Sequence, residues 1–307
     1  MSRIEVNGVT LNVTELPPRG RAAGAVPIVM IHGLAASQAF WYAAGAPVMA
    51  ALGPCLLYDL RGHGRSSSPP TGYGVRDMAR DLETLLDDRG IARAHLVAHS
   101  FGGMVAIAFA LAHPERVASL VLADVRIRPI QRRISIPVAE VPDKVRARLD
   151  EMGLDIDNIS RHDDGVGYLR TVARIEVEAG EEAAGLLSEI YRHPRLFRSR
   201  RNAMKWIELT ERVSLVDDLG REAFGRDDLE RLEMPILILV GGRSTTLASA
   251  RELKRLRPAA ILREIPDVGH FFPMSQPRLF LRPSLRFLRA VNQGKLEARL
   301  RARRRAS

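Results

Sequence analysis

Short runs of apolar residues alternate with segments of helical spacing along the first 125 positions. The runs cover residues 26–31, 55–60, 95–98 and 117–123, and helical spacing is found at 75–89 and after position 100. A strand that is apolar at every position is buried on both faces, as in a parallel sheet that helices cover on both sides. The alternation therefore predicts a doubly wound, mostly parallel α/β sheet.

The sheet is expected to continue towards both ends of the chain. Residues 3–14 alternate weakly in polarity around Asn7 and Gly8, which is typical of a β-hairpin. A helix is expected from Phe40 to Ala51. Near the end, the pattern predicts a strand at 235–240, a helix at about 247–256, a short strand at 260–265 and a last helix at about 277–291.

A long interruption separates the two parts of this pattern. Residues 126–225 contain helical stretches with many charges but no buried strand. We interpret them as a helical cap inserted between two strands, over the carboxyl ends where such sheets bind ligands. The predicted organisation is a core of residues 1–125 and 226–294, a cap of residues 126–225 and a basic tail of residues 295–307.

The net charge of +10 is concentrated at one end of the chain. The tail at 295–307 holds six basic residues and one acidic residue, so half of the excess lies there. Aromatic residues make up only 5%, and none are interleaved with basic residues as base-stacking surfaces require. The charge therefore favours a solvated helix end over a nucleic-acid partner.

Hydropathy and cysteine content limit the cellular location of the protein and the kinds of cross-link and metal site that it can contain. No run approaches 18 uncharged apolar residues, and the first residues lack the hydrophobic stretch of a signal peptide. We expect a cytoplasmic protein without a membrane span. The single cysteine, Cys55, excludes an internal disulfide and a cysteine-clustered metal site, and its apolar neighbours favour a buried core role.

One junction between a strand and a helix has an unusual pattern. The apolar run that ends at Ala98 is followed by Ser100, and Gly102 precedes a helical segment. A serine on such a sharp turn is held clear of the sheet, needs small residues two positions before and after it, and lies at a helix N-terminus. The five residues of this pattern, 98–102, also fit an ordinary strand-turn-helix junction without a catalytic role.

Four motifs then occur in an informative order. They are His32-Gly33-Leu34 after a strand, residues 59–66 after the next, residues 99–103 at the junction and Gly269-His270 near the end. Together they resemble the α/β-hydrolase superfamily, whose members with lids include serine esterases, thioesterases and carbon–carbon bond hydrolases. The resemblance covers about residues 4–124 and 232–291 and leaves the cap unassigned.

The resemblance implies a role for each matching residue. Ser100 would be the nucleophile on a nucleophile elbow, and His270 would be the general base that removes its proton. The backbone N–H groups of Leu34 and Phe101 would form the oxyanion hole. His99 precedes the serine, and on such an elbow it is expected to point away from the hydroxyl.

The acid of the catalytic triad is where the sequence departs from the family. Ser244 stands where the carboxylate is usually found after the strand at 235–240. Some members carry the acid one strand earlier, where this chain has Asp124, so Asp124 is the candidate partner of His270. Alternatively, Asp124 caps the entry to the lid, and His270 is oriented by Ser244, by water or by nothing. Asp267 is a poorer candidate because it shares the short turn of His270.

The substrate pocket is expected to be apolar on its acyl side. By resemblance, His32, Gly33, Trp41 and Phe271 are assigned to it. His32 and His63 also belong to motifs that shape loops in the family, so a structural hydrogen-bonding role is favoured for both rings.

Two basic runs in the cap leave the polarity of the substrate open. One comprises Arg126, Arg128, Arg132 and Arg133, and the other spans residues 193–206. Arginines at a site entrance would suit a carboxylate, a phosphopantetheine or a coenzyme A phosphate. Such runs are more often solvated helix faces.

The sequence as a whole predicts a serine hydrolase that acts on an ester, thioester or activated carbon–carbon bond of a small molecule, most simply a carboxylic ester. Serine at position 100 excludes the dehalogenases and epoxide hydrolases of this fold, which attack with a carboxylate. Neither a metal nor a cofactor is implied, and a homodimer is compatible with the sequence. The alternatives are a receptor-like protein with weak or no turnover, and an acyltransferase or thioesterase of a biosynthetic pathway.

Overall fold

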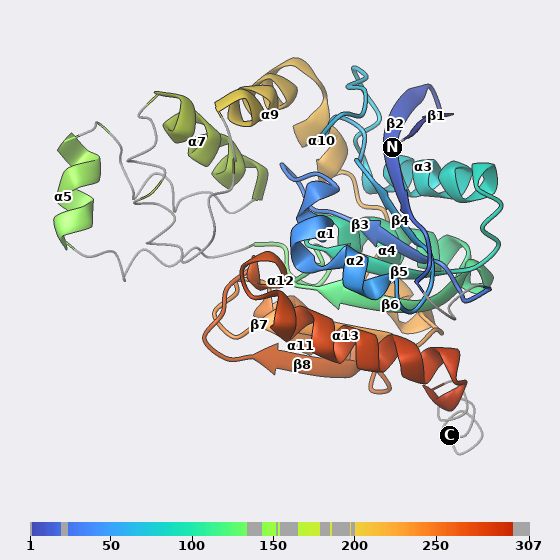
Figure 1. Ribbon diagram of the computed structural model, residues 1–307. Helices are drawn as coiled ribbons and strands as arrows, with labels where there is room; N and C mark the ends of the chain where they lie inside the picture. Colours follow the sequence, from blue (N-terminus) through green and yellow to red (C-terminus); the bar gives the residue numbers. More distant parts are fainter. Residues whose placement is uncertain are drawn as a thin grey trace.

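An eight-stranded sheet forms the centre of the computed structural model, which describes residues 2–19, 24–133, 143–151, 165–178 and 200–296 and the single residues 153, 185 and 197 (Figure 1). The strand order is β1-β2-β4-β3-β5-β6-β7-β8. The pairs β1–β2 and β2–β4 are antiparallel and the other pairs are parallel, which confirms the predicted doubly wound sheet. The strands are β1 Ser2–Val6, β2 Val9–Leu16, β3 Ile28–Ile31, β4 Cys55–Tyr58, β5 Ala94–His99, β6 Val117–Ala123, β7 Ile236–Gly241 and β8 Ile261–Ile265.

The first two strands form the predicted hairpin. Asn7 and Gly8 both have positive φ, 46° and 75°, and Val6 pairs with Val9 across the turn. Asparagine and glycine tolerate this left-handed conformation, which matches the twist of the two flanking strands. The local sequence therefore sets this edge of the sheet.

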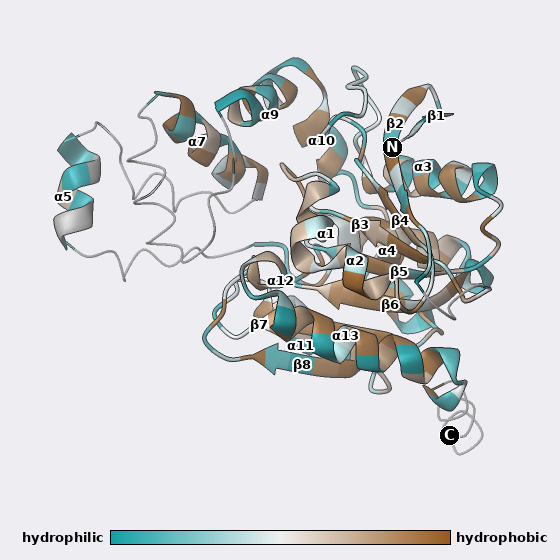
Figure 2. Ribbon diagram, viewed as in Figure 1, coloured by the Kyte–Doolittle hydropathy of each residue, from teal (hydrophilic) through white to brown (hydrophobic). Residues whose placement is uncertain are grey.

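Helices cover both faces of the sheet, which explains the continuous apolar runs. Alternate side chains of β3 and β5, such as Val29 and Leu96, pack into one core with α3 (Val75–Asp88), α4 (Phe101–Ala112) and α11 (Leu247–Leu256). The intervening side chains, such as Met30 and Val97, pack into a second core with the helices of the opposite face. Those helices are α1 (Ala39–Ala44), α2 (Ala46–Met49), α12 (Phe272–Ser275) and α13 (Pro277–Asn292). Figure 2 shows the resulting hydrophobic centre.

One predicted helix is divided in the structure. The helix expected from Phe40 to Ala51 is broken at Gly45, whose φ is 102° and whose N–H closes the end of α1 on the carbonyl oxygens of Trp41 and Tyr42. Glycine in this left-handed conformation is a common helix end. The chain therefore turns between α1 and α2, and the expectation of a single helix was wrong.

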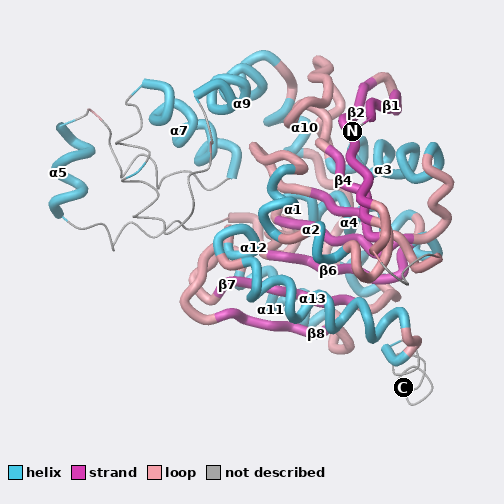
Figure 3. The backbone as a smooth tube through the Cα atoms, viewed as in Figure 1, coloured by secondary structure: helices cyan, strands magenta, loops and turns pink. Residues whose placement is uncertain are grey.

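Helices alone occupy the described residues between β6 and β7, apart from loops (Figure 3). They are α5 (Asp143–Glu151), α7 (Gly165–Glu178), α9 (Arg200–Arg212) and α10 (Leu215–Gly220), followed by a 3-10 turn at Asp227–Arg231. α7 packs against α9, and α9 reaches the core, where Nζ of Lys205 donates to the carbonyl oxygen of Gly64 at 2.6 Å. The predicted boundaries of core and cap stay a prediction, and most of the basic tail, residues 297–307, lies outside the described residues.

Two expectations from composition bear on the described part of the chain. Cys55 is buried in β4, and burial raises the pKa of its thiol to about 12, which confirms its core role. None of the helices in the described ranges combines the length and the apolar character needed to cross a membrane.

Candidate active site

Ser100 lies at the corner between β5 and α4. Its φ of 53° and ψ of −125° place a residue with a side chain in a sparsely populated region. The Ser100 N–H donates to the carbonyl oxygen of Ala123 at 3.1 Å, which ties the corner to β6. A methyl group on Gly102 would lie 2.5 Å from the carbonyl oxygen of His32, so only glycine fits there. The small residue in the sequence pattern thus permits the strained turn.

His270 connects this serine to a carboxylate. It lies in the loop between β8 and α12, where its Nε2 is 3.0 Å from Oγ of Ser100 and its Nδ1 is 2.7 Å from Oδ1 of Asp124. A carboxylate only accepts hydrogen bonds, so Nδ1 carries the proton and donates. The lone pair of Nε2 in the neutral ring therefore faces the serine hydroxyl.

Asp124 follows β6 and is completely buried. Its Oδ1 accepts hydrogen bonds from Nδ1 of His270, from Oγ1 of Thr246 at 2.7 Å and from Oγ of Ser244, and its Oδ2 accepts one from the N–H of Gly241 at 2.8 Å. Burial alone would raise the pKa of this carboxyl, but the charge of His270 and the hydrogen bonds outweigh it and lower the pKa. The group is held as a carboxylate.

The competing acids and hydroxyls have other positions. Asp267 is 79% exposed and pairs with Arg243 at 2.7 Å rather than with His270. Ser244 donates to Asp124, so its hydroxyl supports the carboxylate. Sequence reasoning did not identify Thr246. The hydroxyl residues in the loop after β7 could have indicated this role. Because β7 pairs with β6, that loop lies beside Asp124 at the end of β6.

The residues predicted to supply the oxyanion hole lie beside the serine. A methyl group on Gly33 would be 2.9 Å from Cβ of Ser100, so the main chain before Leu34 passes directly against the nucleophile candidate. Phe101 is the first residue of α4. Both Leu34 and Phe101 line the cavity that contains Ser100.

Two residues assigned to the pocket are core residues instead. His32 is fully buried, its Nδ1 donates to the carbonyl oxygen of Gly33 at 2.7 Å, and its Nε2 accepts from the N–H of Leu60 at 3.0 Å. Burial also lowers the pKa of His32. The ring thus braces two loops. Trp41 is also fully buried and packs against Phe280, because the start of α1 turns this side chain towards α13.

His99 has a position that sequence reasoning did not foresee. Its ring lies 4.7 Å from the ring of His270, and its Nε2 donates to the main-chain oxygen of His270 at 3.0 Å. The ring of His99 also stacks on that of Phe40, with the ring centres 4.4 Å apart. Burial, with a smaller contribution from the charge of His270, lowers the pKa of His99 to about 3. A neutral ring therefore supports the loop that carries His270.

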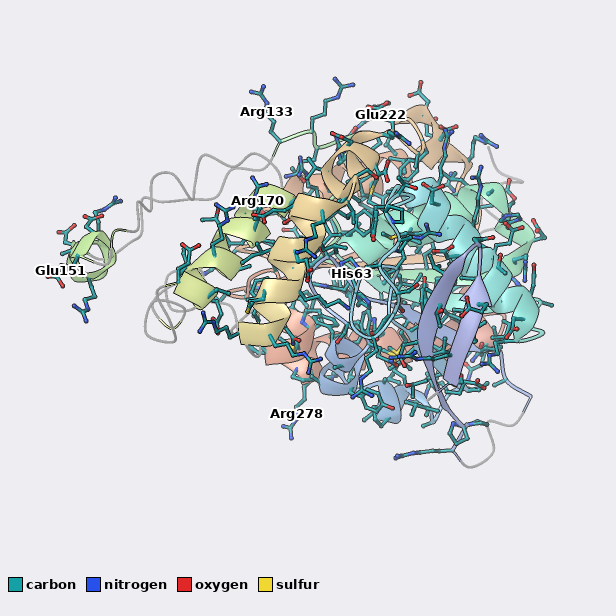
Figure 4. The ribbon with its side chains drawn as sticks, turned by 90° about the horizontal axis from the view of Figure 1, so that it is seen from above. His63, Arg133, Glu151, Arg170, Glu222 and Arg278 are labelled. Atoms are coloured by element: carbon teal, nitrogen blue, oxygen red, sulfur yellow. The ribbon has the colours of Figure 1, made fainter. Side chains whose placement is uncertain are left out.

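Two cavities meet at Leu34. One, of about 400 Å³, contains Ser100, and the other, of about 370 Å³, is lined by Phe271 and His63. His63 lies near the middle of the view in Figure 4, and its ring is 5.6 Å from that of Trp206 in α9. A larger hollow of about 850 Å³ lies near Pro235, at the opposite end of the sheet from the serine. Nowhere in the described ranges do three or more His, Cys, Asp or Glu side chains gather as metal ligands.

Comparison with known proteins gives consistent results. A sequence model described as "Alpha/beta hydrolase family" matches residues 28–282. The chain is 28% identical, over 92% of its length and 97% of the relative, to "Putative carbamate hydrolase RutD" of Caulobacter segnis. The solved structure of Est816, described as an N-acyl homoserine lactone degrading enzyme, aligns with a TM-score of 0.61 at 25% identity, covering 93% of this chain and 100% of that one. The enol-lactonase from Burkholderia xenovorans LB400 shares the fold, with a TM-score of 0.59 at 24% identity over 94% of this chain and 99% of that one.

Proposed function

The chain belongs to the alpha/beta hydrolase family, and from that premise we propose that it is a serine hydrolase acting through an acyl-Ser100 intermediate. The observation that carries the proposal is the continuous hydrogen-bonded relay from Asp124 to His270 at 2.7 Å and from His270 to Ser100 at 3.0 Å. Relays of this kind activate a hydroxyl that is otherwise unreactive at neutral pH.

The first half of the reaction forms the acyl-enzyme. Oγ of Ser100 attacks the carbonyl carbon of the substrate while its proton moves to Nε2 of His270. The resulting imidazolium is stabilised by Asp124, whose lowered pKa keeps it ionised. The tetrahedral intermediate then collapses, the bond to the leaving group breaks, and His270 returns the proton to that group.

The developing negative charge on the carbonyl oxygen needs donors. The N–H groups of Leu34 and Phe101 are the proposed pair, supported by the close approach of Gly33 to Ser100 and by the position of Phe101 at the start of α4. Loss of one such donor typically costs about 3 kcal/mol of transition-state stabilisation. Because main-chain groups supply these donors, the side chains at both positions can shape the pocket.

The second half of the reaction hydrolyses the acyl-enzyme. A water molecule gives its proton to Nε2 of His270 and attacks the acyl carbon, and collapse of the second tetrahedral intermediate returns the proton to Ser100. The acid product then leaves. The same steps apply to an ester, a thioester, a lactone or a carbamate, since each presents a carbonyl carbon and a leaving group. An acyltransferase would differ only in using another acceptor than water, and an activated carbon–carbon bond would have a carbanion as leaving group.

The receptor-like alternative would be favoured by the absence of a carboxylate at Ser244 and by alanine instead of glycine at position 98 of the elbow. The hydrogen bond between Asp124 and His270 supports the hydrolase instead, because it supplies the carboxylate that Ser244 lacks. Two of the proteins reported above are described as a carbamate hydrolase and as a lactone-degrading enzyme, which also favours turnover.

The test is hydrolysis of a short p-nitrophenyl ester together with labelling by a fluorophosphonate. We expect Ser100→Ala to abolish both turnover and labelling, since the nucleophile is removed. Ser275→Ala is the matched control, because Ser275 is exposed on α12 and donates to the carbonyl oxygen of Phe271. Unchanged turnover in Ser100→Ala would show that the proposal is wrong. Ligand binding without labelling of the unmodified protein would favour the receptor.

A further inference from the structure

The cavity beside Ser100 is strongly asymmetric in charge. Its lining includes Ser100 and apolar side chains such as Met104. Two loop segments add Arg126, Arg128, Arg132, Arg221 and Glu222. The cavity of about 400 Å³ that holds the nucleophile is therefore lined by four arginines and a single acid.

The charges of the outer arginines are partly compensated. Arg132 lies 3.8 Å from Glu222, and both side chains are exposed, at 83% and 61%. An exposed pair at this separation contributes little. Arg221 lies 3.3 Å from Asp218, a residue that also accepts hydrogen bonds from the N–H groups of Gly72 and Tyr73. These two arginines therefore have acids of their own.

Arg128 differs from them. Its Nη1 donates to the main-chain oxygen of Leu219 in α10, and no carboxylate of the described residues pairs with it. A carbonyl oxygen orients the guanidinium without neutralising it. Arg126 is also held by main-chain oxygens, since its Nε donates to Gln131 at 3.1 Å and its Nη2 to Arg132. The guanidinium of Arg128, an exposed residue, is thus held at the cavity by the carbonyl oxygen of Leu219.

The remaining walls of the cavity are apolar. They include Val75, Met104, Val166 and Val216, so the cavity that holds both the serine and the arginines suits a hydrocarbon chain. A planar guanidinium matches the two oxygens of a carboxylate in shape and charge. Arg133, the remaining arginine of this basic run, does not line the cavity and extends outwards from the molecule in Figure 4.

We propose that this cavity selects substrates that carry a carboxylate at the far end of a short apolar chain, and that Arg128 is the residue that binds it. The preferred substrate would be a monoester, or the corresponding thioester, of a dicarboxylic acid. This inference rests on the proposed serine hydrolase activity, because the cavity is defined relative to the nucleophile.

The test compares two esters that differ at one end only. The mono-p-nitrophenyl ester of adipic acid carries a carboxylate where p-nitrophenyl hexanoate carries a methyl group. We expect the intact protein to show a kcat/KM about tenfold higher for the adipate monoester, mainly through a lower KM, since a contact far from the reacting bond is made equally in ground and transition states. The preference should fall as salt is raised from about 0.01 M to about 0.5 M, because salt screens the ion pair.

Arg128→Gln should lower kcat/KM for the adipate monoester about tenfold and so remove the preference, with hydrolysis of the hexanoate measured in parallel. The neutral ester thus reports in each variant that the protein is folded. Arg278→Gln is the matched control, because Arg278 is exposed on α13, extends outwards from the molecule in Figure 4 and does not line the cavity. It removes the same charge but should keep the preference.

The outcomes separate this inference from the proposed function. If neither ester is cleaved in a manner that depends on Ser100, the serine hydrolase proposal itself fails. If the hexanoate is cleaved but the adipate monoester is not preferred, or the preference persists in Arg128→Gln, the assignment of the cavity is refuted. A preference for coenzyme A thioesters without one for the adipate monoester would identify phosphate as the anion and would also refute it. Should Arg128→Gln lose both activities, a salt-independent preference in the unmodified protein would decide against the proposal.

Discussion

Replacing Asp124 by asparagine tests the relay at its least accessible point. The two oxygens of Asp124 have different partners, because Oδ2 accepts from the main-chain N–H of Gly241, whereas Oδ1 accepts from His270, Ser244 and Thr246. Asparagine must place its oxygen at one position and its NH₂ group at the other. A main-chain N–H can only donate, whereas hydroxyls and an imidazole can also accept. The amide oxygen is therefore expected to face Gly241.

That orientation reverses the proton arrangement of His270. The NH₂ group of the asparagine would donate to Nδ1, so the ring proton would move to Nε2 and point at Ser100. A ring in this tautomer cannot accept the proton of the serine, and the negative charge that stabilises the imidazolium is also lost. In serine triads, such a change lowers turnover by roughly four orders of magnitude, or about 5 kcal/mol.

The assay is kcat/KM for a p-nitrophenyl ester, with thermal unfolding measured in parallel to verify that the variant is folded. Asp267→Asn is the matched control, because Asp267 lies three positions from His270 yet is 79% exposed and pairs with Arg243. We expect this control to retain activity within about twofold, since exposed ion pairs contribute little. Activity of Asp124→Asn within about tenfold of the unmodified protein would refute the reasoning.

Two further predictions concern the loop at Gly33 and the buried histidines His63 and His99. Gly33→Ala places a methyl group 2.9 Å from Cβ of Ser100, so the loop or the nucleophile must move, and kcat should fall roughly 10- to 100-fold in the same ester assay; an unchanged kcat would contradict the close approach. Acid should also destabilise the fold, because burial lowers the pKa of both His63 and His99 from 6.5 to about 3. The unfolded chain then binds more protons than the folded one, so this stability is complete above pH 6.5 and is lost as the pH falls below that value, by about 2 kcal/mol for each ring between about pH 7 and pH 5. Urea unfolding at several pH values measures this loss, and a free energy of unfolding that stays constant over that range would contradict it.

The architecture could be predicted because its determinants are local in the chain. A strand buried on both faces must be apolar throughout, and a strained corner must have small neighbours, so residues 26–31 and 117–123 and the turn at Ser100 are visible without coordinates. The break between α1 and α2 at Gly45 was not predicted, because the apolar residues on both sides of it keep the spacing of one continuous helix. The order of the motifs also identified Ser100 and His270 as partners, although they are 170 positions apart in the sequence.

The surroundings of that pair depended on which strands are neighbours. Only the adjacency of β6 and β7 brings the hydroxyls of Ser244 and Thr246 to Asp124, and only the folded chain brings Arg221 and Arg128 to the same cavity. Hydrogen bonds and charge act over a few ångströms in space, whatever the separation in sequence. The sequence by itself therefore determined the sheet, the serine corner and the candidate residues, while the tertiary structure alone decided which carboxylate meets His270 and which charges surround the cavity.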